Sequence, residues 1–156
     1  MTNGALLDTS FFIRLNNETD ALHSNATNYL RFLLQNNFQL YLSTISIAEY
    51  CVIGEFDELP LKYLNIIFLD TEHAKIAGKL AKIIFENKDK LRLKERNIIA
   101  NDTKLFAQAN YIKEIKYYIT SDTESGKMYT LLKDKIDIDF DFIDLSLPPS
   151  LTIKTV

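Results

Sequence analysis

Short apolar runs alternate with longer segments of helical spacing along this chain. The runs at residues 5–7, "QLYLST", "NIIFLD" and "KYYIT" predict strands, because each is short, continuous and bounded by polar residues. The run "DIDFDFIDL" alternates apolar and acidic residues, as a half-buried strand does. Apolar residues recurring every three or four positions predict helices over 10–15, 20–35, 44–56, 71–88, 101–112 and 127–135. Strands that alternate with helices indicate an α/β protein with a parallel sheet covered on both faces.

The length of the chain suits one domain with a sizeable core. It has 156 residues, and "LPPS" is a natural end for the last predicted strand, so we expect a domain over 1–147 and a C-terminal tail over 148–156. Only 4 glycines occur, and none forms a glycine-rich phosphate loop. This counts against a P-loop or Rossmann nucleotide site.

Charge and cysteine content narrow the class of protein further. The net charge of -3 argues against a broadly basic nucleic-acid surface, although it allows a local basic rim. The single cysteine, Cys51, excludes an intramolecular disulfide and fits a reducing compartment. We see neither a signal-peptide pattern nor an apolar run that could span a bilayer. We therefore expect a cytoplasmic protein without a membrane partner.

Four acidic residues stand where an apolar segment would otherwise continue. Asp8 ends the first apolar run, and Asp122 follows "KYYITS". Glu49 is the only charge in "STISIAEYCVI", and Asp102 follows "NIIAN". Because parallel strands end at one edge of their sheet, the four acids can meet there. Each acid alone has an ordinary alternative: the aspartates could cap helices, and Glu49 could complete a capping box with Ser46.

Several carboxylates at one edge would repel one another and raise their own pKa values. A divalent cation removes that cost. Oxygen ligands without a histidine or cysteine cluster favour Mg²⁺ or Mn²⁺ over Zn²⁺.

The four acids also carry a resemblance to a known family. "LLDTSFFIRL", "STISIAEY", "IIANDTKLFAQA" and "YYITSD" resemble, in order, the motifs of the PIN-domain family, especially its VapC-like toxin ribonucleases. The resemblance implies a three-layer α/β/α sandwich with about five parallel strands. It also implies a metal-dependent endoribonuclease that hydrolyses RNA phosphodiester bonds as the toxin of a toxin–antitoxin pair. One departure is "SDTESGKMY", which lacks the aromatic residue often found there and leaves the role of Glu124 open.

The resemblance assigns roles that the residue types support. Asp8, Glu49, Asp102 and Asp122 would be the catalytic residues and hold one or two Mg²⁺ or Mn²⁺ ions. The neighbouring hydroxyl residues would orient carboxylates or metal-bound water, unless they serve only turns and caps; they are Thr9, Ser10, Thr120 and Ser121. A basic rim could bind RNA phosphates, although a solvated charged run is the favoured interpretation of "KLRLKER". The candidates for the rim are Arg14, Arg92, Lys94 and Arg96.

We also expect protein partners. The helix over 44–56 carries more apolar positions than one core-facing stripe needs, so an amphipathic antitoxin helix could dock there. The residues concerned are Ile45, Ile47, Tyr50, Val52, Ile53 and Phe56, with Leu22, Tyr29 and Phe32 on the preceding helix. Core packing or homodimerisation could use the same residues.

Two other functions compete with the ribonuclease. A catalytically silent PIN-like domain would only bind a partner. A haloacid-dehalogenase-like phosphatase also places an aspartate after its first strand, but it needs a second aspartate where this chain has Ser10.

Overall fold

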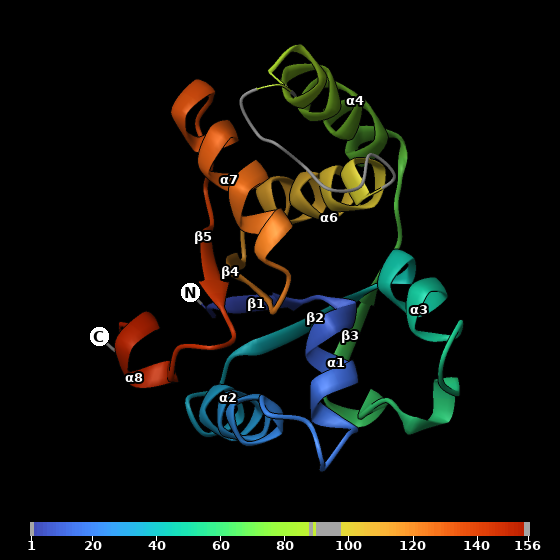
Figure 1. Cartoon of the computed structure of the whole chain (residues 1–156), viewed down its shortest axis with the longest axis vertical. Helices are drawn as coiled ribbons and strands as arrows, with labels where there is room; N and C mark the ends of the chain where they lie inside the picture. The colour runs from blue at the N-terminus through green and yellow to red at the C-terminus, as the bar shows by residue number, and fades with distance from the viewer. Residues whose placement is uncertain (1, 88, 90–97, 155–156) are drawn as a thin grey trace.

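The fold is built on a sheet of five strands that all run parallel. A computed structural model describes residues 2–87, 89 and 98–154 (Figure 1). Within them the strand order is β3-β2-β1-β4-β5, and every pairing is parallel. This confirms the predicted α/β class and parallel sheet. The strands are β1 (Gly4–Leu7), β2 (Gln39–Ser43), β3 (Leu64–Ile67), β4 (Ile115–Thr120) and β5 (Asp141–Asp144).

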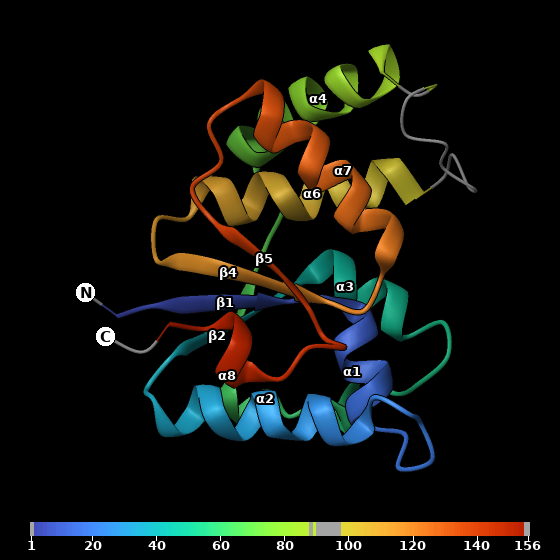
Figure 2. The ribbon, with the colours of Figure 1, turned by 60° about the vertical axis from the view of Figure 1, so that its left-hand side comes forward.

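Helices cover both faces of this sheet and make three layers (Figure 2). One face carries α1 (Thr9–Leu15), α2 (His23–Gln35) and α8 (Pro149–Thr152), and the other carries α4 (Thr71–Glu86), α6 (Ile98–Tyr111) and α7 (Thr123–Lys135). The short α3 (Thr44–Tyr50) follows β2, and the 3-10 turns η1 (Phe56–Glu58) and η2 (Leu61–Tyr63) lead into β3. None of the helices in the described ranges is long and apolar enough to cross a membrane.

The central strand divides its side chains between two apolar cores. Ala5 and Leu7 of β1 pack with the helices of the α1–α2 face, whereas Leu6 packs with those of the α4–α6 face. All three are completely buried. Period-two alternation on a strand that is covered on both sides explains why the sequence here is a continuous apolar run. The first polar residue after it, Asp8, therefore marks the point at which the strand leaves the sheet.

Gly4 lets β1 begin in the narrow space between its two neighbours. A Cβ atom at this position would stand 2.6 Å from the ring of Tyr41 and 2.9 Å from the carbonyl oxygen of Glu114. Its backbone N–H donates to that same carbonyl, at 2.7 Å. Any larger residue would displace β1 and the acid that follows it.

The helix after β2 is shorter than its sequence predicts and begins differently. Ser43, not Ser46, is the cap, because its backbone is still extended and its hydroxyl accepts a hydrogen bond from the backbone N–H of Ile45. Ser46 lies buried inside α3. The helix ends at Tyr50 rather than at residue 56. The predicted capping box of Ser46 with Glu49 is therefore wrong, which leaves the Glu49 carboxylate free for other partners.

The apolar residues that were expected to form a docking groove divide between core and surface. Tyr29 and Tyr50 are buried in the core, so the core-packing alternative holds for these two. Val52, Ile53 and Phe56 are exposed, because the chain after Tyr50 turns away from the helix axis. Cys51 is exposed as well.

The C-terminal segment over 148–156, predicted as a tail, contains α8. The hydroxyl of Tyr29 in α2 lies 2.7 Å from that of Thr152 and donates to the carbonyl of Leu147 at 2.6 Å. Ile153 is buried against the same core. The described part of this segment thus packs on the body of the domain.

Candidate functional site

The four acidic residues lie around one cavity at the carboxyl edge of the sheet. The connection from β1 to β2 runs to one side of β1, and β4 lies on its other side, so a crevice opens where these strands end. The cavity there has a volume of about 330 Å³. Its lining residues are Asp8, Thr9, Ser10, Ile13, Glu49, Asn101, Asp102 and Asp122.

Asp8 is fixed by two hydroxyl groups, one at the end of β4 and one in the first turn of α1. Thr120 donates to its Oδ2 atom at 2.8 Å, and Ser10 donates to the same atom at 3.0 Å. Asp8 occupies the N-cap position of α1, but its side chain makes no capping hydrogen bond. The capping alternative therefore does not explain this residue, whose carboxylate is 6% exposed and faces the cavity.

Glu49 is held across the cavity from another pair of elements. Thr9 donates to its Oε2 atom at 2.5 Å, and the amide of Asn101 donates to its Oε1 atom at 2.7 Å. These bonds connect α3 to the first turns of α1 and α6. Both oxygens of Glu49 are thus occupied by neutral donors, which fix its orientation without neutralising its charge.

Asp102 and Asp122 complete the set in different ways. Asp102 lies within α6, not at its start, and Ser125 of α7 donates to its Oδ2 atom at 2.8 Å. Asp122 is the N-cap of α7, where its Oδ1 atom accepts the backbone N–H of Glu124 at 2.9 Å. The capping alternative is therefore realised for Asp122. It does not exclude a second role, because one carboxylate has two oxygens and this one lines the cavity.

Burial and the crowding of negative charge raise the pKa of two of the four acids, Asp8 and Asp102. Burial raises the pKa of Asp102 to about 8, and the charges of Asp8, Asp122 and Glu49 add to the rise against the Ser125 hydrogen bond. Burial also raises the pKa of Asp8, with a further contribution from Glu49, although the bond from Thr120 opposes it. The site is therefore electrostatically incomplete without a positive charge.

The donor set fits a hydrated Mg²⁺ or Mn²⁺ ion. The lining offers carboxylate, hydroxyl and amide oxygens and no imidazole or thiol, which are the ligands of hard cations. Within the described residues, no three acid, histidine or cysteine side chains stand close enough to hold one ion together. Mg²⁺ commonly keeps several waters and takes one or two carboxylates. Such an ion suits the negative charge and the oxygen donors of this cavity.

Three of the four predicted orienting hydroxyls contact the acids. Thr9 binds Glu49, while Ser10 and Thr120 bind Asp8. The fourth, Ser121, accepts instead from the guanidinium of Arg14, at 3.4 Å. The other candidates for a basic rim, Arg92, Lys94 and Arg96, lie outside the described residues.

The sequence reasoning missed two residues that hold the acids. Asn101 binds Glu49, and Ser125 binds Asp102. Each is near a predicted acid in the sequence. Asn101 directly precedes Asp102, and Ser125 follows Asp122 by three positions. Their signal was therefore present as polar residues at the starts of two helices, but polar residues are common there for other reasons.

Three solved structures with a similar fold are of VapBC proteins. Three similar chains are in VapBC2 of Rickettsia felis bound to a promoter DNA fragment (16% identity, TM-score 0.59), in DNA-bound VapBC of Salmonella typhimurium (16%, 0.55) and in VapBC-1 of nontypeable Haemophilus influenzae (19%, 0.58). The Rickettsia match covers 90% of this chain and 97% of the other chain. The Salmonella match covers 92% and 99%, and the Haemophilus match covers 92% and 98%, in the same order. No family model and no curated protein matches the sequence. The chain thus has the fold of a VapC-like PIN domain.

Proposed function

We propose that this protein is a metal-dependent endoribonuclease. The observation that carries the proposal is the convergence of four carboxylates on one cavity, where burial and mutual repulsion raise the pKa of Asp102 to about 8. A fold that places such a site at a sheet edge incurs an electrostatic cost, and a bound divalent cation relieves it. When bound, Mg²⁺ or Mn²⁺ supplies a hydroxide nucleophile at neutral pH and neutralises charge on the phosphate.

The chain's own residues prepare the site in this proposal. Asp8 and Asp102 would be the principal ligands, because both are buried and the hydroxyl groups that hold them all donate to the Oδ2 atom. Glu49 and Asp122 would complete the negative field and orient water. Thr120, like Ser10, holds Asp8 at a fixed angle, which is how groups behind the ligands tune metal sites.

The simplest test of the activity uses RNA and a chelator. Purified protein should cleave single-stranded RNA with Mg²⁺ or Mn²⁺, stop in EDTA and recover when either ion is added back, with no need for nucleotide or Zn²⁺. The silent-domain alternative predicts no cleavage and no carboxylate-dependent Mn²⁺ binding by isothermal titration. Phosphatase chemistry lacks support, because Ser10 occupies the position of its second aspartate and bonds to Asp8.

We further propose that the protein acts as a toxin restrained by an antitoxin. The structures it resembles are of VapBC pairs, and the segment after α3 exposes Val52, Ile53 and Phe56. An amphipathic helix could bind these side chains through its own apolar face. Homodimerisation is proposed on the general frequency of symmetric dimers, and sedimentation of the purified chain would test it.

Co-expression with a small adjacent reading frame tests the toxin role. The proposal predicts growth arrest by this protein alone, and binding and rescue by the neighbour. A neighbour that neither binds nor inhibits, with no growth arrest, would instead indicate a nuclease without toxin function.

A further inference from the structure

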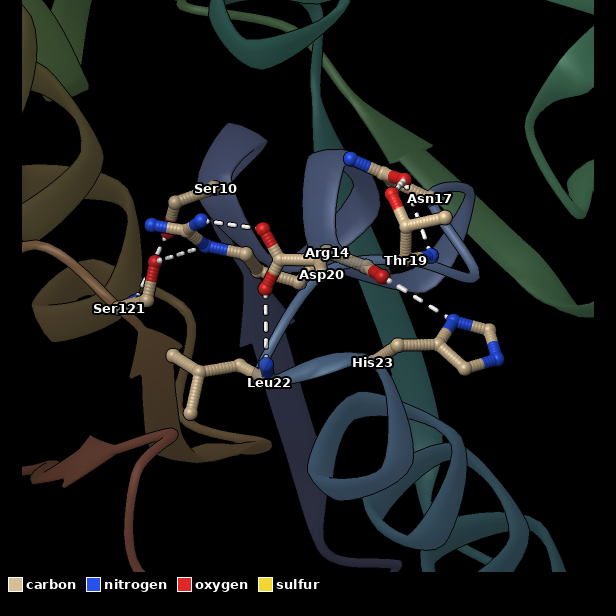
Figure 3. A network of polar contacts seen from close by, with 8 residues as sticks. All are labelled: Ser10, Arg14, Asn17, Thr19, Asp20, Leu22, His23 and Ser121. Carbon is tan, nitrogen blue, oxygen red and sulfur yellow. Dashed lines mark hydrogen bonds and ion pairs between the residues drawn. The ribbon is translucent and has the colours of Figure 1, made fainter.

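A charged network at the end of α1 lies beside the proposed catalytic cavity. Figure 3 shows the guanidinium of Arg14 between Ser121, at the end of β4, and Asp20, in the loop before α2. Its Nη1 atom lies 2.5 Å from Oδ2 of Asp20, and its Nε atom donates to the Ser121 hydroxyl at 3.4 Å. Ser121 directly precedes Asp122 of the cavity. The network therefore places a cation next to the acids.

The same network connects to Asp8 through backbone and hydroxyl groups. The backbone N–H of Ser121 donates to the hydroxyl of Ser10 at 2.9 Å, and Ser10 donates to Asp8 at 3.0 Å. Arg14 and Asp8 thus share the short polar chain through Ser121 and Ser10. A phosphate held by Arg14 would lie close to a bond cleaved at Asp8.

Asp20 is fixed where it can hold the arginine. The backbone N–H of Leu22 donates to its Oδ1 atom at 2.8 Å, and its side chain is 12% exposed, against 38% for that of Arg14. The Leu22 bond, together with Arg14, lowers the pKa of Asp20. Asp20 is therefore a charged, anchored anion, and the arginine is the more accessible partner. The arginine's backbone carbonyl contacts His23 Nδ1 at 3.2 Å, which ties this turn to α2 (Figure 3).

We propose that Arg14 binds the RNA phosphate next to the cleaved bond, and that Asp20 is the internal anion that occupies Arg14 until RNA arrives. This inference rests on the proposed function. The Nη2 atom of Arg14 makes no hydrogen bond to any described residue, so it can reach a phosphate oxygen while Nε keeps its bond to Ser121. A guanidinium can direct two N–H groups at one phosphate.

Electrostatics give this pair its significance. The chain carries a net charge of -3, and its cavity is lined with carboxylates, so RNA is repelled unless a nearby cation compensates. Asp20 neutralises the charge of Arg14, so the pair attracts distant RNA less than Arg14 alone would. Asp20 also competes with a nearby phosphate for the N–H groups of Arg14. Asp20 therefore lowers the affinity of the protein for RNA, and it does so only through Arg14.

A double-mutant cycle on RNA binding tests both halves of the proposal. Four full-length proteins are titrated in EDTA against a fluorescent single-stranded RNA of mixed sequence, at several salt concentrations. They are the wild type, Arg14→Ala, Asp20→Asn and the double variant. Arg14→Ala should weaken binding about tenfold and reduce the slope of log K against log salt by about 0.7, the value for one phosphate on a single strand. Asp20→Asn should strengthen binding about threefold, because a neutral amide no longer neutralises Arg14 or competes with phosphate for it, and should change little in the Arg14→Ala background.

Two further variants separate binding from folding. Arg31→Ala removes an exposed arginine of α2 that makes no hydrogen bond or ion pair to the described residues, and it should bind RNA like the wild type. Arg14→Lys keeps the charge but lacks the paired N–H donors of a guanidinium. Its affinity for RNA should therefore lie between those of the wild type and Arg14→Ala. Equal far-UV spectra and melting temperatures would show that the variants are folded.

The outcomes are distinguishable. Wild-type affinity and salt slope in a folded Arg14→Ala protein that still cleaves RNA would overturn this inference and leave the ribonuclease intact. Weaker binding by Asp20→Asn would show that Asp20 supports rather than occupies Arg14, which contradicts the second half. A wild-type protein that neither binds nor cleaves RNA would overturn this inference and the proposed function together.

Discussion

The hydroxyl of Thr120 donates a 2.8 Å hydrogen bond to Oδ2 of Asp8, across 112 residues of chain. It joins the ends of two neighbouring strands, the central β1 and the adjacent β4, at the point where the cavity opens. The backbone continues the same connection, because the N–H of Asp8 donates to the carbonyl of Ile119 at 3.1 Å. The position of the Asp8 carboxylate is therefore set by the sheet itself.

Replacement of Thr120 by valine should expose this dependence. Thr120→Val keeps the shape of a residue that is 1% exposed. It removes a hydroxyl that donates to Asp8 and accepts the backbone N–H of Asp122 at 3.0 Å, so we expect a loss of about 2 kcal/mol in the free energy of unfolding, at about 1 kcal/mol per bond. Loss of a group that orients a ligand should lower RNA cleavage by about 10- to 100-fold. Thr130→Val, on an exposed face of α7, is the matched control and should keep full activity. Equal cleavage rates in the two variants would contradict a positioning role.

Asp8→Asn should abolish cleavage and leave the fold intact. Asparagine keeps an oxygen that can accept the bonds from Thr120 and Ser10, but it removes the charge that would hold the ion. Because burial raises the pKa of Asp8, the ionised carboxylate destabilises the metal-free protein. The variant should therefore melt at a higher temperature than the wild type in EDTA at pH 8, as measured by circular dichroism. A lower melting temperature would show that the Asp8 charge stabilises the fold instead.

The raised pKa of Asp102 predicts a pH dependence of stability. Its pKa is about 8 in the folded protein and 3.8 as an ordinary carboxyl, so between these values the folded state binds the extra proton. Protonation of Asp102 therefore contributes its full amount to the free energy of unfolding below pH about 4, and this contribution is lost as the pH rises to about 8. Between these values the free energy of unfolding should fall by at most about 1.4 kcal/mol per pH unit. Urea unfolding of the metal-free protein from pH 5 to 9 measures it.

Two controls identify the group responsible for that slope. Asp102→Asn should remove it, whereas Asp57→Asn, at an exposed acid, should leave it unchanged. Saturating Mg²⁺ should flatten the wild-type profile, because the ion replaces the proton. A metal-free stability that rises from pH 5 to 8 would contradict the assignment.

Much of the site could be predicted from the sequence because the strands are short and apolar. The apolar run of β1 stops directly before Asp8, and β4 ends at Thr120, two residues before Asp122. Both acids could therefore be placed at one edge of a parallel sheet without knowledge of side-chain packing. Glu49 and Asp102 could be placed less directly, since a helix start near that edge does not fix which way a side chain points.

The remaining features depended on where helices begin and how they are rotated. Ser43 and Ser46 can both cap a helix, and the choice follows from the length of β2, which the apolar run does not define. The helical spacing of Tyr29 and Phe32 identifies apolar faces but not which of them meets the sheet. Asn101 and Ser125 are ordinary polar residues until α6 and α7 pack so that each faces an acid.

The most direct measurement of the central claim is single-turnover cleavage of labelled RNA by the purified wild type, Asp8→Asn and Asp102→Asn, each with EDTA, Mg²⁺ or Mn²⁺. The account predicts cleavage by the wild type with either ion, none after chelation, and none by the two variants with any ion. Wild-type cleavage that persists after thorough chelation, or undiminished cleavage by a folded Asp8→Asn protein, would contradict a carboxylate-held metal at the edge of this sheet.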